Sequence, residues 1–338
     1  MKVSRVTVAL FFSGIASSVA FTYPASKAVS HNLKTSPSQT KAKSSSLFPQ
    51  PRSKVTLSAT AALTPNDSSN GNGFLTFKTK YGYLNPFAIW YGFTAIALGL
   101  PWYVALTIAQ LLYKVTNNKI DKMKIIPIFL SQIWGEFLLT LTASRPEVVN
   151  KEILDNFMKE GRAGMFVANH NSWMDIPFVG VTLGWRNYKL ISKAELGKVP
   201  ILGKAIRLGG HVMVDRSNRK SQLLTFKAGM QWLKDGVHLA AFPEGTRSKT
   251  GRLLPFKAGA YKMAQKVGAP IIPMSIVKSG EAHPADWMFP RQKSAGLCKI
   301  VIHEPVETKD RDEKEVEKLV RQAIIDGLPE EQRPLGEE

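Results

Sequence analysis

The chain has 338 residues, of which 44% are hydrophobic and 21% are charged, and its formal net charge is +19. This composition excludes a wholly disordered protein and is sufficient for one large domain or two small ones with appendages. The positive charge favours an acidic partner: a phosphate-bearing lipid, an anionic membrane surface or nucleic acid. Because Cys298 is the single cysteine, an intrachain disulfide and a multi-cysteine metal site are excluded, and no bound metal is expected.

The first 73 residues are predicted to be a targeting leader. Residues 1–20 combine two early basic residues, an apolar run and small residues before a cleavage point, which indicates a signal peptide. Residues 21–73 have no Asp or Glu before Asp67 and are rich in Ser, Thr, Lys and Pro, which is typical of a transit peptide and flexible linker. The combination resembles the bipartite leader of complex plastids, so we expect a plastid membrane. The alternative, an ordinary signal peptide with a disordered linker, would give the endoplasmic reticulum membrane.

Residues 74–145 are predicted to be a helical, membrane-embedded segment. No charged residue occurs from Tyr81 to Tyr113, and one helix of that length would exceed the hydrocarbon core of about 30 Å. Because Pro101 lies inside the stretch, we expect a break there and a helical hairpin that enters one leaflet. One kinked span is the alternative.

A second apolar stretch, residues 125–141, contains Gln132 and Glu136. These polar residues favour an amphipathic or core helix over a membrane span.

Residues 146–328 are predicted to form an α/β domain, because short apolar runs alternate with amphipathic helical segments. Strands are expected at 165–168, 189–192, 211–214, 237–242, 270–277 and 298–303, and helices at 173–183, 223–233, 260–267 and 311–328. Gly236 and Gly268 indicate where two of these helices end. The chemistry is expected in loops at one edge of the sheet. Residues 329–338 are predicted to be an acidic, solvated tail.

One heptapeptide at residues 169–175, Asn-His-Asn-Ser-Trp-Met-Asp, contains a histidine and a carboxylate that could act together. On one helix His170 and Asp175 would lie about 140° apart, so they can meet only if the chain turns between them. Asp175 could then hold one imidazole nitrogen and leave the other free to accept a proton from a hydroxyl. Alternatively, Ser172 and Asp175 form a capping box that only starts a helix.

Three further stretches have side chains suited to binding a phosphate. Residues 242–248, Phe-Pro-Glu-Gly-Thr-Arg-Ser, offer a glycine turn, hydroxyl groups and Arg247, which can bind a phosphate monoester bidentately. Asp215 and Arg216 follow a predicted strand, and Lys193 follows another. Each has a plainer interpretation: a turn, a surface ion pair and an exposed lysine.

Taken in order, these stretches together with Pro255–Phe–Lys257–Ala–Gly259 and Ala269–Pro–Ile–Ile–Pro273 resemble the lysophosphatidic acid acyltransferase (1-acylglycerol-3-phosphate acyltransferase) family. The likeness is close over residues 165–277, and Phe-Pro-Glu-Gly-Thr-Arg-Ser is its most specific part. The resemblance implies a mixed central sheet flanked by helices, the glycerolipid acyltransferase fold. One departure is His211, where the family usually has an apolar or aromatic residue, and we interpret it as a core or rim histidine.

The resemblance also implies roles for individual residues. His170 would deprotonate the free sn-2 hydroxyl of lysophosphatidic acid, and Asp175 would orient it. The alkoxide would then attack the carbonyl of an acyl thioester. The phosphate would be bound by Arg247, Lys193 and Arg216, and the glycerol site would be shaped by Glu244, Gly245 and Thr246.

Direct transfer of this kind needs no cofactor; the co-substrate would be acyl-CoA or acyl-ACP. Membrane lipid is an expected partner, and if the donor is acyl-ACP, acyl carrier protein is a second one. Two other functions stay open: transfer to glycerol 3-phosphate or another lysophospholipid, and lipid binding without catalysis. A nucleic-acid partner is disfavoured, because part of the positive charge lies in the predicted leader and no nucleic-acid motif is present.

Overall fold

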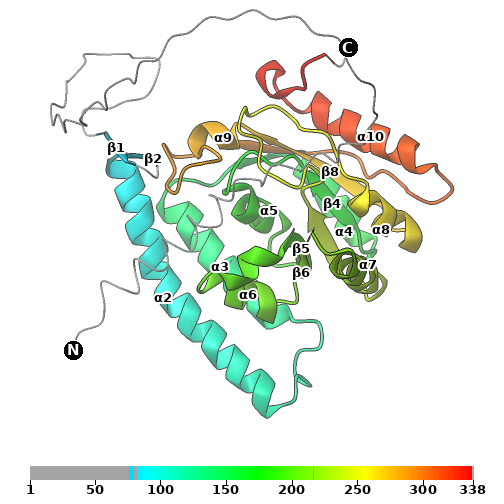
Figure 1. Ribbon diagram of the computed structural model, residues 1–338, viewed down its shortest axis with the longest axis horizontal. Helices are drawn as coiled ribbons and strands as arrows, with labels where there is room; N and C mark the ends of the chain where they lie inside the picture. Colours follow the sequence, from blue (N-terminus) through cyan, green and yellow to red (C-terminus); the bar gives the residue numbers. More distant parts are fainter. Residues whose placement is uncertain (1–75, 80–81, 216, 337–338) are drawn as a thin grey trace, which may run out of the picture. The chain divides into compact units, whose positions relative to one another are not determined.

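A computed structural model describes residues 76–79, 82–215 and 217–336 (Figure 1). The predicted signal and transit peptides lie outside these residues. Within them, a seven-stranded sheet has helices on both faces, and a two-stranded sheet of β1 (Phe77–Thr79) and β2 (Gly82–Leu84) precedes the first long helix.

The large sheet has the strand order β3-β9-β8-β4-β7-β5-β6. Its strands are β3 (Glu147–Val149), β4 (Met165–Ala168), β5 (Tyr188–Lys193), β6 (Val212–Val214), β7 (His238–Ala241), β8 (Ile271–Val277) and β9 (Lys299–Ile302). Every pairing is parallel except that of β8 with β9. The mixed α/β sheet is therefore confirmed, and all six expected strands are present. β3 is an additional edge strand that the sequence interpretation missed.

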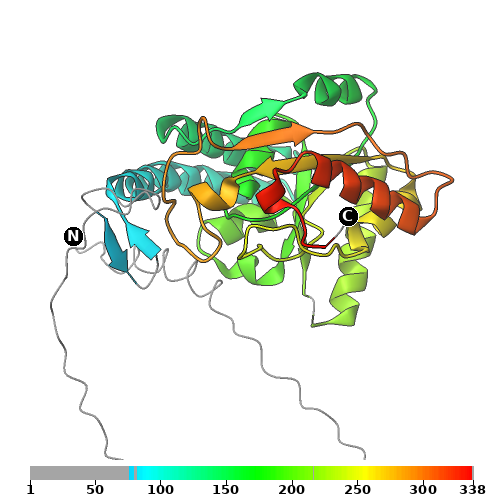
Figure 2. The same cartoon turned by 90° about the horizontal axis from the view of Figure 1, so that it is seen from above.

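Side chains of β4 alternate between two separate cores, as expected for a strand covered on both faces. Phe166 and Ala168 pack with the first core, which includes residues of α3 (Ile125–Leu141), α4 (Lys151–Lys159) and α5 (Asp175–Leu183). Met165 and Val167 pack with the second, which includes residues of α7 (Arg219–Lys234), α8 (Gly259–Val267) and α10 (Glu313–Asp326). Figure 1 shows α5 on one side of the strands and α7, α8 and α10 on the other, and Figure 2 shows α10, in red, alongside β8. β4 is consequently central and fully buried.

The predicted break at Pro101 is wrong. Helix α2 runs without interruption from Pro86–Val115, and it is the one helix in the described part of the chain long and apolar enough to cross a membrane. Pro101 is exposed on the outer side, so its ring faces no tightly packed neighbour. The adjacent Trp102 is buried and stacks on Trp134 of α3, with ring centres 4.7 Å apart. Packing on both sides of the proline thus holds the helix together where propensity alone would break it.

The helical hairpin instead forms between α2 and α3 (Ile125–Leu141), the helix that the sequence predicted as amphipathic or part of the core. The N-terminal part of α2 contacts the C-terminal end of α3 through Trp90, whose indole nitrogen donates to the carbonyl of Leu141 at 3.1 Å. Each helix exposes an apolar stripe with a spacing of three or four residues. The stripe of α2 includes Ile89, Phe93, Leu100, Val104, Ile108, Leu111 and Val115, and that of α3 includes Ile125, Phe129, Ile133, Phe137 and Leu141.

The connector between these helices, residues 116–124, is anchored to the sheet by a buried lysine. Lys189 of β5 donates to the carbonyls of Met123 (2.9 Å) and Lys124 (3.1 Å). Burial lowers the pKa of Lys189 to about 7, although the nearby Asp121 opposes this shift. The connector of the helical pair and the sheet are therefore joined by hydrogen bonds from this lysine side chain to the connector backbone.

The C-terminal residues are less solvated than expected. Gln332 is buried: its carbonyl accepts from Leu253 at 2.8 Å, and its side-chain oxygen accepts from the backbone of Lys278 at 2.8 Å. The segment thus pairs with two loops of the domain.

We expect Pro101→Ala to stabilise the protein, because alanine restores the backbone donor and removes the clash of the ring with the preceding turn. The gain should be about 1–3 kcal/mol, below or near the usual cost of a helix-interior proline. Thermal unfolding in detergent measures it. Pro86→Ala is the matched control, since Pro86 occupies the first turn, where proline is well tolerated. A lower melting temperature for Pro101→Ala would contradict the continuous helix.

Candidate functional site

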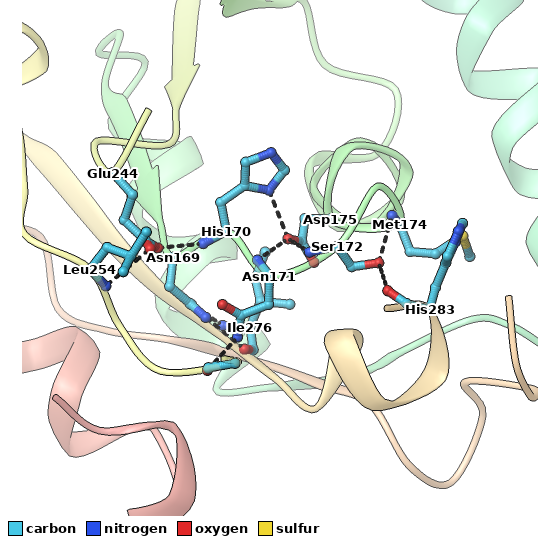
Figure 3. A network of polar contacts seen from close by, with 11 residues as sticks. Asn169, His170, Asn171, Ser172, Met174, Asp175, Glu244, Leu254, Ile276 and His283 are labelled. Carbon is cyan, nitrogen blue, oxygen red and sulfur yellow. Dashed lines mark hydrogen bonds and ion pairs between the residues drawn. The ribbon is translucent and has the colours of Figure 1, made fainter. Parts of the chain in front are cut away.

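The site begins where β4 ends, and Asn169 extends the pairing of that strand by one residue. Its side-chain nitrogen donates to the carbonyl of Ile276 at 2.9 Å, and its side-chain oxygen accepts from the Ile276 amide at 2.7 Å. This side chain therefore continues the contact with β8 after the regular strand has ended. His170 follows at the carboxyl edge of the sheet, where the chain turns toward α5 (Figure 3).

The turn brings His170 and Asp175 together, as the sequence interpretation required. Nδ1 of His170 lies 2.8 Å from Oδ2 of Asp175, whose side chain is fully buried, while 14% of the histidine side chain is exposed. The same oxygen accepts from the backbone amides of Asn171 (2.7 Å) and Ser172 (2.8 Å). Asp175 therefore holds the histidine and fixes the turn that precedes α5. That helix begins at Asp175 with Met174 as its N-cap and no side-chain cap, so Ser172 is not its N-cap and the predicted capping box is wrong in that respect.

This contact assigns the protons of the imidazole. Because a carboxylate is an acceptor, Nδ1 of His170 carries the hydrogen and Nε2 has a free lone pair. Figure 3 shows the second ring nitrogen directed away from Asp175 and the other residues drawn. A neutral imidazole in this state can accept a proton from a hydroxyl group.

The loop after β7 holds His170 at three further points. The ring of Phe242 stacks on the imidazole with centres 4.1 Å apart and an angle of 14°. Oε1 of Glu244 accepts from the His170 amide at 2.6 Å, and the amide of Ser248 donates to the His170 carbonyl at 2.8 Å. The position of the histidine thus depends on a segment that follows it by more than 70 residues.

Glu244 is buried and binds two backbone segments at once. Its Oε1 holds the His170 amide and its Oε2 accepts from the amide of Leu254 at 3.0 Å. Burial raises the pKa of Glu244 to about 8, even though the two amides favour the ionised form. Both oxygens face backbone, so the geometry favours a positioning function for this side chain over direct contact with glycerol.

Arg247, a predicted phosphate ligand, lies near enough to Asp175 for the two charges to interact. Burial lowers its pKa, and Asp175 and Asp286 act in the opposite direction. In the part of the chain that the structure describes, its guanidinium forms no hydrogen bond or ion pair within 4 Å. Asp286 itself pairs with Lys249 at 3.2 Å. A half-buried, unpaired guanidinium is suited to binding an anionic ligand.

The other predicted ligands are placed less directly. Gly245 forms the turn with φ +73°, and its amide donates to the Phe242 carbonyl at 3.0 Å. Thr246 is exposed beside it. Lys193 ends β5 at the same edge of the sheet, two strands from β4 and hence about 10 Å away. Arg216 lies outside the described residues.

Several supporting residues were missed or given no function from the sequence. Asn169 and Phe242 lie within the quoted motifs, so their adjacency to the key residues was the available signal. His283 had no sequence signal: its carbonyl accepts from Ser172 Oγ at 2.9 Å, and its Nε2 lies 3.1 Å from the Trp287 carbonyl. Burial lowers its pKa to about 4, so it is neutral at neutral pH.

His211 is a core histidine, as interpreted from the sequence. Its Nδ1 accepts from the Leu190 amide at 2.8 Å, and burial lowers its pKa to about 3. It therefore supports β5 and is no second base.

Parts of the chain are similar to known proteins. Residues 145–277 match the family model described as Acyltransferase. Over these residues the chain is similar to the acyltransferase family. A chloroplastic 1-acyl-sn-glycerol-3-phosphate acyltransferase of Brassica napus is 35% identical over 155 residues, which are 45% of this chain and 43% of that protein. A 1-acyl-sn-glycerol-3-phosphate acyltransferase of Chlamydomonas reinhardtii is 30% identical over 203 residues, or 60% of this chain and 58% of the relative.

The chain is also similar to a solved structure. The crystal structure of the 1-acyl-sn-glycerophosphate acyltransferase from Thermotoga maritima has a TM-score of 0.51 and 26% identity, over 69% of this chain and 95% of that one. The mixed sheet flanked by helices is therefore the fold of that enzyme. The chain spans about half the length of the curated relatives it matches.

We expect Glu244→Gln to destabilise the protein by about 1–3 kcal/mol, the usual cost of an unsatisfied buried polar group. The side-chain NH₂ group of glutamine is a donor at a position where Glu244 offers an acceptor oxygen. One of the two backbone amides, that of His170 or that of Leu254, therefore loses its partner. Denaturant unfolding in detergent measures the change, with exposed Glu160→Gln as control. If stability is unchanged and only acceptor binding weakens, Glu244 shapes the glycerol site instead.

Proposed function

We propose that the protein transfers an acyl group from an acyl thioester to the sn-2 hydroxyl of 1-acylglycerol 3-phosphate, which gives phosphatidic acid. The observation that carries this proposal is the 2.8 Å contact between His170 Nδ1 and Asp175, within the residues that match the acyltransferase family model. The two relatives and the solved structure are named for acyl transfer to the same class of acceptor. No serine or cysteine nucleophile is required, because a positioned hydroxyl and a base suffice.

In the proposed reaction, Nε2 of His170 removes the proton of the acceptor hydroxyl. The resulting oxygen attacks the thioester carbonyl, an ester C–O bond forms and the C–S bond breaks. The thiolate then takes the proton back from the imidazolium. The carboxylate of Asp175 stabilises the imidazolium while it exists, and being fully buried it does so in a medium of low dielectric constant.

Acceptor selection is proposed to depend on Arg247. The charge of Asp175 acts on the pKa of the Arg247 guanidinium, so the two groups are near each other. A phosphate bound to Arg247 would therefore lie close to His170. Lys193, at the same edge of the sheet, is proposed as an additional cation, and so is Arg216, with Gly245 and Thr246 bordering the acceptor.

The exposed apolar stripes of α2 and α3 are proposed to contact the membrane that contains the acceptor. The chloroplastic relatives support a plastid membrane, reached through the predicted leader, with the endoplasmic reticulum membrane as the alternative.

A panel assay tests the function and its alternatives. The detergent-solubilised protein is given acyl-CoA or acyl-ACP together with lysophosphatidic acid, glycerol 3-phosphate or another lysophospholipid. We expect the fastest transfer to lysophosphatidic acid. Preference for glycerol 3-phosphate or another lysophospholipid would replace the acceptor, and no transfer to any acceptor would leave a lipid-binding protein without catalysis.

We expect His170→Ala to reduce turnover by at least about 100-fold, in the range lost when a general base is removed. Asp175→Asn should keep a small residual activity, because its amide oxygen can accept the same donors but cannot neutralise the imidazolium. Initial rates with saturating substrates measure both, with unfolding curves alongside. His303→Gln is the matched control, since His303 follows β9 toward the opposite edge of the sheet. A His170→Ala variant that kept a tenth of the turnover would exclude the proposed base.

We expect Arg247→Lys to be nearly as impaired as Arg247→Ala, because lysine keeps the charge but loses the planar, bidentate donor. The loss should appear as weaker binding of lysophosphatidic acid, by about 10-fold or more for charge-assisted hydrogen bonds. Rates with monoacylglycerol, which has no phosphate, should change little. If Arg247→Ala depresses both acceptors equally, Arg247 is structural and another cation binds the phosphate.

A further inference from the structure

A hollow of about 220 Å³ lies at the C-terminal end of α2, apart from the residues of the candidate active site. It is bordered by α2, the connector and α6 (Leu202–Leu208). Three of its lining residues are cationic, namely Lys114, Lys124 and Arg207, and none is acidic. Its volume is below the roughly 300–1,000 Å³ of pockets that enclose a whole small-molecule ligand. A compact, multiply charged anionic group is the chemistry that such a hollow favours.

The three cations are only partly engaged by the described protein. Lys114 makes no hydrogen bond or ion pair with its side chain in the described residues. Lys124 donates to Asn118 at 2.7 Å and lies 4.1 Å from the ring centre of Tyr113. Arg207 donates to the carbonyl of Gly197 through one of its nitrogens and is exposed. Their positive charges are therefore not neutralised by a carboxylate.

The nearest acid of the connector cannot supply this neutralisation. Asp121 is buried, and its oxygens accept from the Tyr113 hydroxyl (2.5 Å) and from the amides of Ile125 and Ile126 (both 2.8 Å). Its charge also acts on Lys189. Asp121 thus organises the connector internally and leaves the hollow basic.

A plainer explanation accounts for part of the cluster. Lys114 and Arg207 lie in the last turns of α2 and α6, where cations are favourable beside the helix C-terminus. Favourable placement of cations at helix ends does not explain why Lys114, Arg207 and also Lys124 surround the same hollow. The two explanations predict different responses to substitution.

The surroundings identify the class of ligand. The apolar stripe of α2 reaches the last turn of the helix at exposed Leu111, which precedes the lining residue Lys114 by three positions and is therefore its neighbour on the helix surface. A phosphate in the hollow could therefore have acyl chains along this stripe, at the depth where basic residues meet lipid headgroups. We propose that Lys114, Lys124 and Arg207 bind the phosphate group of an anionic phospholipid at a site separate from the catalytic centre.

Binding of short-chain phosphatidylglycerol to the full chain in a neutral detergent tests this proposal. This lipid is a phosphodiester, unlike the proposed acceptor, and Arg247→Ala checks that the proposed active site makes no contribution. We expect wild-type protein to bind it at least about tenfold more tightly than phosphatidylcholine, as charge-assisted contacts allow. The double variant Lys114→Gln with Arg207→Gln should lose this preference.

The matched control is Lys119→Gln with Lys122→Gln, which removes the same amount of charge from the nearby connector but none from the hollow. We expect the control to weaken binding less than about twofold, and both doubles to keep their melting temperature and turnover. If the Lys114→Gln, Arg207→Gln variant unfolds, the single variant Lys114→Gln must lower the affinity for phosphatidylglycerol. This substitution breaks no hydrogen bond or ion pair of the described residues.

Equal losses in the two doubles, or equal affinity for the two lipids, would overturn the proposal in favour of diffuse attraction or helix-end stabilisation. Competition by millimolar inorganic phosphate would assign the site to free phosphate. Absence of competition supports the lipid headgroup.

Discussion

A single buried oxygen, Oδ2 of Asp175, connects the fold to the chemistry. It receives Nδ1 of His170 and the amides of Asn171 and Ser172, all within 2.8 Å. The two amides fix the turn between β4 and α5, and the third contact fixes the imidazole. Because the Asp175 side chain is fully buried, the loss of any of these donors would deprive its negative charge of a hydrogen-bond partner and would destabilise the site. The carboxylate that starts the helix is therefore also the one that sets the tautomer of the histidine.

A second buried carboxylate, Glu244, extends this arrangement to the neighbouring strand. It joins the His170 amide to the Leu254 amide, while Phe242 covers one face of the imidazole. The loop after β7 is thus attached to the residue that follows β4. The same loop carries Arg247, so one rigid connection sets the position of the base relative to the cation proposed to bind phosphate.

The helical pair α2–α3 is linked to the same sheet from another direction. Lys189 of β5 donates to the connector carbonyls of Met123 and Lys124. The pair also packs on the sheet through residues of α3 in the first core. The connector therefore joins two parts of the protein: the surface proposed to meet lipid and the strands that carry the site.

The sequence by itself determined the elements and the order of the motifs. Apolar periodicity located six of the seven strands of the large sheet and the helix at 125–141, because these patterns depend on neighbours a few residues apart. The His170–Asp175 pair could be proposed from a spacing of five residues. Only the tertiary structure decided that Glu244 binds backbone, that His283 supports Ser172, and that α2 continues through Pro101. The physical reason is that these outcomes rest on partners 30 to more than 100 residues away in the chain, such as Trp134 beside Trp102, which local propensity does not encode.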